Sequence, residues 1–172
     1  MRIDPKFLVD HLVYSQWATE RSIEAVGPLT IEDRNRYLYT SHHGVLGTLV
    51  HIYQADRIWL SRLDGSPRLT LADFNETFTL ENLAVTWANI HAGLQSWAGA
   101  LTDDAVTGTL KYVNLQGHPY ELPVWQVILH GVNHASYHRG QITTMLRQLN
   151  HKPIVTDLAA YYSRLLALPS HS

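Results

Sequence analysis

The stretch HGVNHASYHRGQ, residues 130–141, spaces three histidines four residues apart within an otherwise largely apolar segment. In an α-helix, residues at i and i+4 lie on the same face, about 6 Å apart along the axis. Two imidazoles placed in this way can bind one metal ion, as the histidines of the HExxH zinc motif do. The stretch therefore predicts a helix that carries part of a metal site.

A helical wheel separates these three histidines. At about 100° per residue, a core seam near ~20° is defined by Val127, Gly131, Met145 and Leu149. His138 falls at about 20°, His134 at about −20° and Gln141 at about −40°, whereas His130 falls near −60°. The wheel predicts His134 and His138 as the inward pair. One ion shared by His130 and His138 is not expected, because about 12 Å separates them along the axis.

Helical periodicity continues outward from this segment through most of the chain. Asp4-Pro5 places an acidic N-cap before a proline at the first helical position, and Gly27-Pro28 ends the apolar repeat that follows. Apolar spacings of three and four, with capping and breaking residues, predict long helices at 4–26, 41–63, 81–101 and 123–150. Together they predict an all-α four-helix bundle.

The connections between these helices are unequal. The polar segment 29–40 is expected to be a simple connection, and 64–80 a long loop, so the second and third helices need not be antiparallel neighbours. Alternating residues in 107–115 and 118–122, joined by a Gln-Gly turn, predict a small β-hairpin before the fourth helix. A short C-terminal helix is expected to start at a cap, Thr156 or Asp157, and to reach Leu168.

The composition sets limits on the kind of protein. The 172 residues, 45% hydrophobic and 16% charged, fit a single globular domain over 1–172. A net charge of −2 with scattered basic residues argues against a nucleic-acid partner. The absence of cysteine excludes disulfides and thiolate ligands, so a soft metal would need nitrogen or oxygen ligands. Without a predicted signal peptide or membrane span, we expect no membrane association and a cytoplasmic location.

The second predicted helix supplies two further candidates. His51 shares a face with small residues, Gly44, Thr48 and Ala55, which would leave room for a metal and its ligand. Asp56 is expected to be a structural partner for a buried donor, or else an acceptor behind a metal ligand. A solvated surface role is expected for the histidines near predicted ends, loops and polar faces: His42, His43, His91, His118, His151 and His171.

At these residues the chain resembles the DinB-like (DinB/YfiT) family of metal-dependent proteins. The resemblance rests on Leu49-Val50-His51-Ile52 followed by Trp59, and on Asn133-His134 followed by His138-Arg139-Gly140-Gln141. Trp17-Ala18 with Ile23, and Asp157-Leu158 with Tyr161, also look like this family. The resemblance covers essentially the whole chain, and HRGQ four residues after another histidine is its most specific part.

This resemblance implies a four-helix bundle with a crossover between the second and third helices, often assembled as a homodimer. It implies a divalent metal bound by one histidine of the second helix and two of the fourth, which here are His51, His134 and His138. Gln141 is a candidate to hydrogen-bond a ligand imidazole or a bound water. His130 is a flanking candidate, and Arg139 is expected to fix the helix against its neighbours.

Three imidazoles leave positions open on the metal, as in catalytic rather than structural sites. Nitrogen ligation suits zinc or nickel best, with iron, manganese and copper as further candidates. No side chain stands out as a base, so the expected nucleophile is a metal-bound water or thiolate. The absence of a cysteine is compatible with a low-molecular-weight thiol as the source of sulfur.

Several functions remain open at this point. Characterised relatives are thiol-dependent S-transferases and maleylpyruvate isomerases, so the resemblance favours a metal-dependent transferase acting on a small molecule. An open three-histidine centre would serve a metal-dependent hydrolase equally well. A non-catalytic, stress-related metal-binding protein is a further alternative, as is a helical dimer in which the histidines are merely packed.

Overall fold

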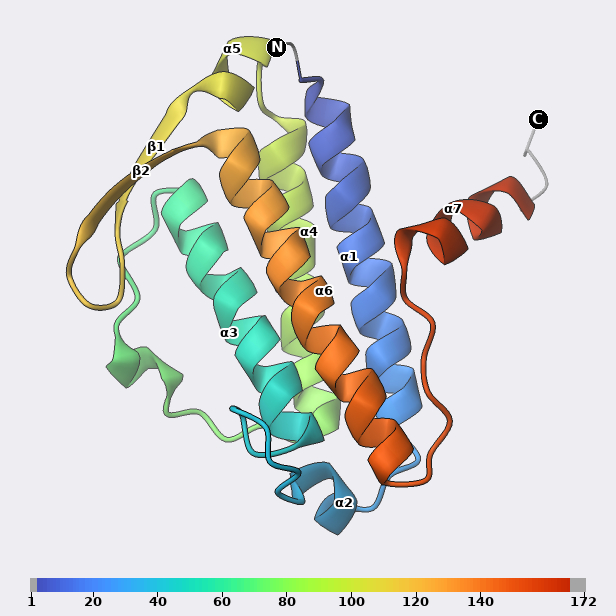
Figure 1. Ribbon diagram of the computed structural model, residues 1–172. Coiled ribbons are helices and arrows are strands. Elements are labelled where there is room, and N and C mark those ends of the chain that lie inside the picture. Colours follow the sequence, from blue (N-terminus) through green and yellow to red (C-terminus); the bar gives the residue numbers. More distant parts are fainter. Residues whose placement is uncertain (1–2, 168–172) are drawn as a thin grey trace.

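Within residues 3–167, which the computed structural model describes, four long helices form the bundle (Figure 1). They are α1 (Pro5–Val26), α3 (Val45–Leu63), α4 (Leu80–Gly99) and α6 (Val124–Gln148). Each lies within a few residues of its predicted range. Asp4 caps α1 as predicted, by accepting a hydrogen bond from the Lys6 amide. Thr79, which was not predicted as a cap, accepts one from the Asn82 amide, and α4 starts one residue before the expected Glu81.

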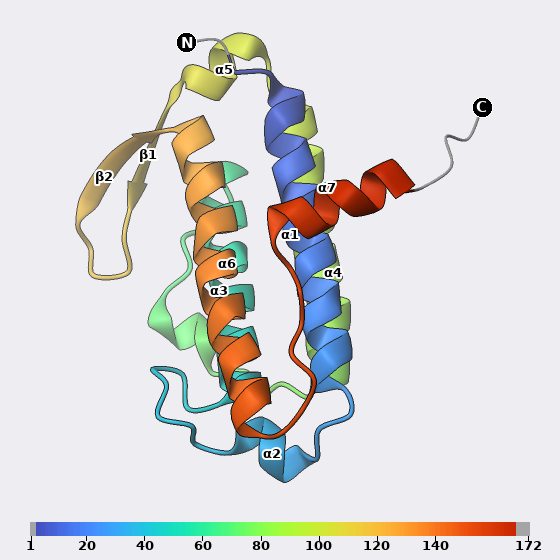
Figure 2. The same cartoon turned by 45° about the vertical axis from the view of Figure 1, so that its right-hand side comes forward.

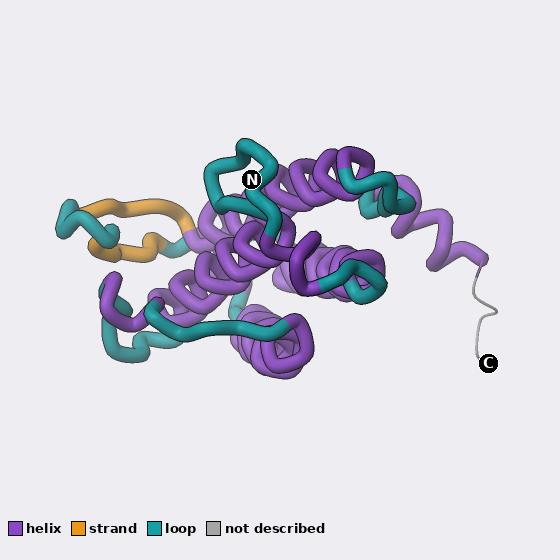
Figure 3. Tube along the Cα trace, turned by 90° about the horizontal axis from the view of Figure 1, so that it is seen from below, coloured by secondary structure: helices purple, strands orange, loops and turns teal. Residues whose placement is uncertain are grey.

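The bundle has the expected crossover between its second and third long helices. In Figure 1, α1 and α6 run downward, whereas α3 and α4 both run upward. The chain therefore returns along the bundle between α3 and α4, through residues 64–79, which include the short helix η1 (Leu71–Phe74). Helix α3 packs against α4 and α6, and α1 packs against the same two helices (Figure 3).

The connection between α1 and α3 is more structured than the sequence indicated. A short helix, α2 (Ile31–Asn35), lies within the segment expected to be irregular, and Thr30 caps it by accepting from the Asp33 amide. Helix α3 begins at Val45 rather than Ser41. The reason is a tight loop in which the amide of Leu38 bonds the carbonyl oxygen of His43, and His43 itself has a positive φ of 67°.

A second short helix precedes the hairpin. Helix α5 (Asp103–Thr107) ends at Thr107, where the first strand was expected to begin, and Thr102 caps it by accepting a hydrogen bond from the Ala105 amide. Strand β1 (Thr109–Val113) pairs antiparallel with β2 (Pro119–Pro123), as predicted, and lies beside α3 (Figure 1). Helix α7 (Leu158–Ala167) projects from the bundle in Figures 1 and 2; its predicted end at Leu168 lies outside the described residues.

The buried face of α6 differs from the predicted seam. Its enclosed residues centre near ~70° on the same wheel, about 50° away from the prediction. Gly131 and Leu149, which were placed on the seam, are only half-buried. The difference arises because α6 packs against both α1 and α3 and therefore also buries apolar residues that the predicted seam left out, namely Ile128, Val132, Ala135, Ile142 and Leu146. His134 and His138 therefore lie at the edge of the buried face, toward α3.

Arg139 joins α6 to α1 from inside the bundle, as predicted. Its guanidinium is 1% exposed and donates to the hydroxyls of Ser15, Thr19 and Ser136 at 2.9–3.4 Å. Such charge-assisted bonds offset the cost of burying the guanidinium, although its Nε has no hydrogen-bond partner among residues 3–167. Among the described helices, none combines the length and hydropathy needed to cross a membrane.

Candidate metal centre

The interface between α3 and α6 brings together the three histidines named from the sequence. His51 extends from α3, and its ring centroid lies 4.5 Å from that of His138 and 5.0 Å from that of His134, both on α6. The rings of His134 and His138 are 4.5 Å apart, as expected for the i, i+4 spacing. The Nε2 atoms of His51 and His134 face each other at 3.1 Å.

Gln141 fixes the orientation of His138. Its Oε1 lies 2.9 Å from Nδ1 of His138, one helical turn away on α6. A neutral imidazole that donates from Nδ1 has its lone pair on Nε2, so this contact leaves Nε2 of His138 available as a ligand atom. The wheel placed Gln141 next to His134 and His138, and in the structure it contacts His138.

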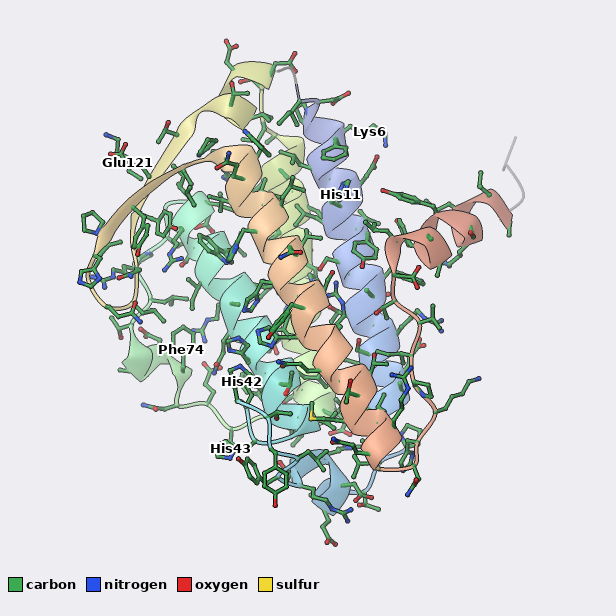
Figure 4. All side chains as sticks on the ribbon, in the orientation of Figure 1. Lys6, His11, His42, His43, Phe74 and Glu121 are labelled. Carbon is green, nitrogen blue, oxygen red and sulfur yellow. The ribbon has the colours of Figure 1, made fainter. Side chains whose placement is uncertain are left out.

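A fourth histidine, His42, joins the cluster from the loop before α3. Its ring stacks on that of His51 at 3.7 Å with an interplanar angle of 11°. One ring nitrogen from each of His42, His51 and His138 lies within 4.8 Å of the others, so these three histidines could hold a metal ion. Figure 4 shows His42 on the face where α3 and α6 meet, with the exposed His43 lower in the loop.

The surface role expected for His42 is therefore wrong. The sequence offered no periodic signal for it, because its position depends on the loop's path rather than on a helical face. The surface role expected for His91 is also wrong, because this residue lies on α4 in the interior of the bundle and is 4% exposed. His43 and His118 are exposed as expected, His151 is half-buried, and His171 lies outside the described residues.

The remaining candidates lie outside the cluster. His130 is exposed; its ring is 5.3 Å from that of Trp59 and 6.1 Å from that of His134, so it flanks the site. Asp56 is buried and accepts a hydrogen bond of 2.8 Å from Nε1 of Trp87. Asp56 thus has the structural role favoured from the sequence.

The electrostatics of the cluster favour neutral imidazoles. Burial, reinforced by His42, His138 and His134, lowers the pKa of His51 to about 3. Burial, followed by the effects of His138 and His130, lowers the pKa of His134 to about 4, and burial also lowers the pKa of His42. Neutral imidazole is the form that binds metal ions, so the ligand atoms need not lose protons at neutral pH.

The donor set fits a divalent metal ion of borderline softness. Facing Nε2 atoms of two neutral histidines can share only one proton, whereas both lone pairs can bind one cation. Asp56 is directed to Trp87, so the set is made of nitrogen ligands. One feature departs from well-supported metal sites: Nδ1 of His134 is buried and has no hydrogen-bond partner among residues 3–167.

Fold and site together define a helical bundle with a histidine cluster between its second and fourth long helices. A sequence model of the DinB family matches residues 5–164, so the chain belongs to the DinB family. It is also similar to "Protein DinB" of Bacillus subtilis (strain 168), with 25% identity over 159 residues, covering 86% of this chain and 89% of that protein.

Two solved structures share the fold. A DinB-like protein from Bacillus cereus ATCC 10987 superposes with a TM-score of 0.59 at 21% identity, covering 81% of this chain and 90% of the other. A DinB-like protein from Bacillus subtilis gives a TM-score of 0.62 at 13% identity, covering 87% and 96% of the two chains. At these identities the likeness establishes the bundle and its topology.

Proposed function

We propose that the protein binds one divalent metal ion through His51, His134 and His138 and acts as a metal-dependent enzyme on a small molecule. The observation that carries the proposal is the 3.1 Å approach of two Nε2 atoms, with Gln141 holding the third imidazole. Zinc or nickel suits this donor set best, and iron, manganese and copper are further candidates. A bound ion would supply Lewis acidity to a substrate oxygen or sulfur.

The proposed reaction class is transfer involving a low-molecular-weight thiol, which the resemblance to characterised relatives supports. The chain contains no cysteine, so any sulfur nucleophile would come from such a thiol. Its own residues then bind and orient: Gln141 fixes the ring of His138, and burial keeps His51 and His134 neutral. Hydrolysis is the competing reaction class, and a screen with a thiol plus an electrophile, beside esters and amides, separates the two.

His42 supports a second candidate function. If it joins the other three histidines, four nitrogen ligands would complete a tetrahedral site and leave no open position, as in structural zinc centres. The protein would then be a non-catalytic metal-binding protein. Its stacking on His51 at 3.7 Å is the observation that favours this alternative.

Metal content measured by inductively coupled plasma mass spectrometry, on protein without a histidine tag, tests the proposal. We expect about one divalent ion per chain, as for a mononuclear site, with loss in His51→Ala, His134→Ala and His138→Ala. His130→Ala is the matched control and should retain the metal. An absence of metal after reconstitution with zinc, nickel, iron and manganese would rule the proposal out.

His42→Ala distinguishes the two functions. For an open three-histidine centre, this variant should keep its metal and its activity. For a closed four-histidine centre, metal affinity should fall by at least about tenfold in both His42→Ala and His134→Ala, as for loss of one coordinate bond. A fall in His42→Ala but not in His134→Ala would instead assign the site to His42, His51 and His138. A competition assay with a chelator measures this difference directly.

A further inference from the structure

A pocket lies between the C-terminal half of α3, the loop that follows it and strand β1. Its volume is about 270 Å³. The lining combines apolar surface from Ile58, Leu69 and Tyr112 with the cationic side chains of Arg62, Arg68 and Lys111, and includes no acidic residue. A positively charged pocket stands out in a chain whose net charge is −2.

Arg62 is the central cation of this pocket. Its Cζ lies 4.5 Å from the centre of the Trp59 ring and 4.6 Å from that of Tyr112, and the two rings meet edge to face. These contacts hold the guanidinium in place. Among residues 3–167 it makes no hydrogen bond or ion pair, although a guanidinium has five N–H donors. Burial lowers the Arg62 pKa; Tyr112 offsets part of this effect, and the charge of Arg68 adds to it.

The neighbouring charges do not neutralise Arg62. Arg68 donates from Nη2 to the carbonyl oxygen of Asn114 at 2.8 Å, which ties the loop to the hairpin without supplying a negative charge. Lys111 pairs with Glu121 across the two strands at 3.1 Å. Figure 4 shows Glu121 on the outer side of the hairpin, away from α3. Two guanidinium groups thus share one pocket without an acidic partner.

We propose that this pocket binds a small organic molecule through an oxyanion group, a carboxylate or a phosphate, held by Arg62 and Arg68. Planar guanidinium groups match the two oxygens of such anions, and an anion between them removes their mutual repulsion. The apolar part of the molecule lies against Tyr112, Ile58 and Leu69. A pocket of about 270 Å³ has room for a ring or short chain beside the anion.

This site is separate from the histidine cluster. His51 and Arg62 are eleven residues apart on α3, which corresponds to about 16 Å along the helix axis. A ligand that fills the pocket does not span that distance. Anion binding is therefore independent of the metal and can be tested on metal-free protein.

A purely structural role for Arg62 makes a different prediction. If its stacking serves only to hold the hairpin against α3, anions bind no better here than at an exposed arginine. Arg62→Met keeps an apolar side chain against Trp59 and Tyr112 but removes the donors. Arg68→Gln removes one charge and leaves the Arg62 stacking intact, and Arg147→Gln, at an exposed position on α6, is the control.

The test is a titration followed by two-dimensional ¹H–¹⁵N NMR at constant ionic strength, with phenyl phosphate, benzoate and the neutral benzyl alcohol as probes. We expect saturable shifts at the amides of Gly65, Ser66 and Tyr112 with one or both anions, and none with the alcohol. The stronger of the two anions identifies phosphate or carboxylate as the natural group. The same spectra show whether each variant is folded.

Arg62→Met and Arg68→Gln should each weaken binding by at least about tenfold, the effect of losing a hydrogen bond between charged groups. Arg147→Gln should bind as the wild type does. Shifts that do not saturate with either anion would overturn the proposal. So would equal binding by wild type and Arg68→Gln, a variant that keeps the stacked Arg62.

Discussion

The carboxylate of Asp56 is buried, with 6% of the residue exposed, and it accepts one hydrogen bond. The donor is Nε1 of Trp87, at 2.8 Å. Nε2 of His91 lies 3.5 Å from the same oxygen, Oδ2, close enough for electrostatic attraction but with no hydrogen bond. The interaction joins α3 to α4, the parallel pair that the crossover brings together.

We expect Asp56→Ala to lower the free energy of unfolding by about 1–3 kcal/mol, because it leaves the Trp87 N–H buried without an acceptor. Urea denaturation measures the change. Asp56→Asn keeps an acceptor oxygen and should lose less. Equal stability of the alanine variant and the wild type would contradict the structural role assigned to this carboxylate.

His51 and His134 give the metal-free protein a defined pH dependence. Their pKa values, about 3 and about 4 in the folded chain, lie below the value near 6.5 of an unfolded histidine. Below pH ~6.5 the unfolded chain therefore takes up protons that the folded chain does not. The free energy of unfolding should be unaffected by these groups above pH ~6.5 and should fall as the pH drops toward ~4.

Urea unfolding of metal-free protein at several pH values between ~7.5 and ~4.5 checks this sign. His51→Phe should flatten the decline, since it removes one of the two groups. His118→Gln, at an exposed position on the hairpin, should leave the slope unchanged. A stability that rises as the pH falls through this window would contradict the burial argument.

At the scale of elements, regular structure was predictable and the loop that completes the cluster was not. Apolar spacings and caps located the four long helices, and residues four apart on one helix had to share a face. The wheel missed the buried face of α6 by about 50° because its seam was drawn through four residues and left out buried apolar ones such as Ile128, Val132 and Leu146. His42 could not be found because its loop depends on backbone contacts and on the positive φ of His43.

Gly47 fixes the approach of that loop to the first turn of α3. A Cβ at this position would overlap the carbonyl oxygen of His42, which is backbone and cannot rotate away. Gly47→Ala should therefore displace the loop and lower the free energy of unfolding by about 1–3 kcal/mol, the usual cost of overpacking. Urea denaturation and the NMR signals of the His42 ring measure both effects.

Gly140 provides the opposite case on α6. Its Cβ would meet no atom within 4 Å, so Gly140→Ala should stabilise the protein by up to about 1 kcal/mol through helix propensity alone. If Gly47→Ala lowers the free energy of unfolding and Gly140→Ala raises it, the contact with His42 determines the effect at position 47, rather than the helix propensity of glycine. A Gly47→Ala variant as stable as the wild type would show that the loop moves without cost.

At the scale of the whole molecule, the crossover determines which helices can share a site. Because α3 and α4 run in the same direction, α3 is free to lie against α6 along its other side. Residues 83 positions apart, His51 and His134, thereby become neighbours. The hairpin also lies beside α3. Residues of α3, the loop after it and β1 line the pocket proposed above to bind an anion. One helix thus contributes to both proposed sites, which differ in their chemistry.

Helix α7 packs against the bundle through one large apolar side chain and leaves the others exposed. Tyr161 packs against Tyr14 and Trp17, whereas the other large apolar side chains of the helix are exposed, Leu166 to 88%. Exposed apolar residues gathered on a projecting helix are typical of an interaction surface (Figure 2). We propose that the chain forms a homodimer, as the family resemblance implies, and that α7 contributes to its interface.

Light scattering coupled to size-exclusion chromatography should therefore give twice the chain mass of 19.5 kDa. Leu166→Glu should shift the protein toward monomer, because a charge in an apolar interface is costly to desolvate. Val85→Glu, which replaces an exposed apolar residue on α4, should remain dimeric. A monomeric wild type would refute the dimer, whereas a dimer unaffected by Leu166→Glu would move its interface from α7 to another face of the bundle.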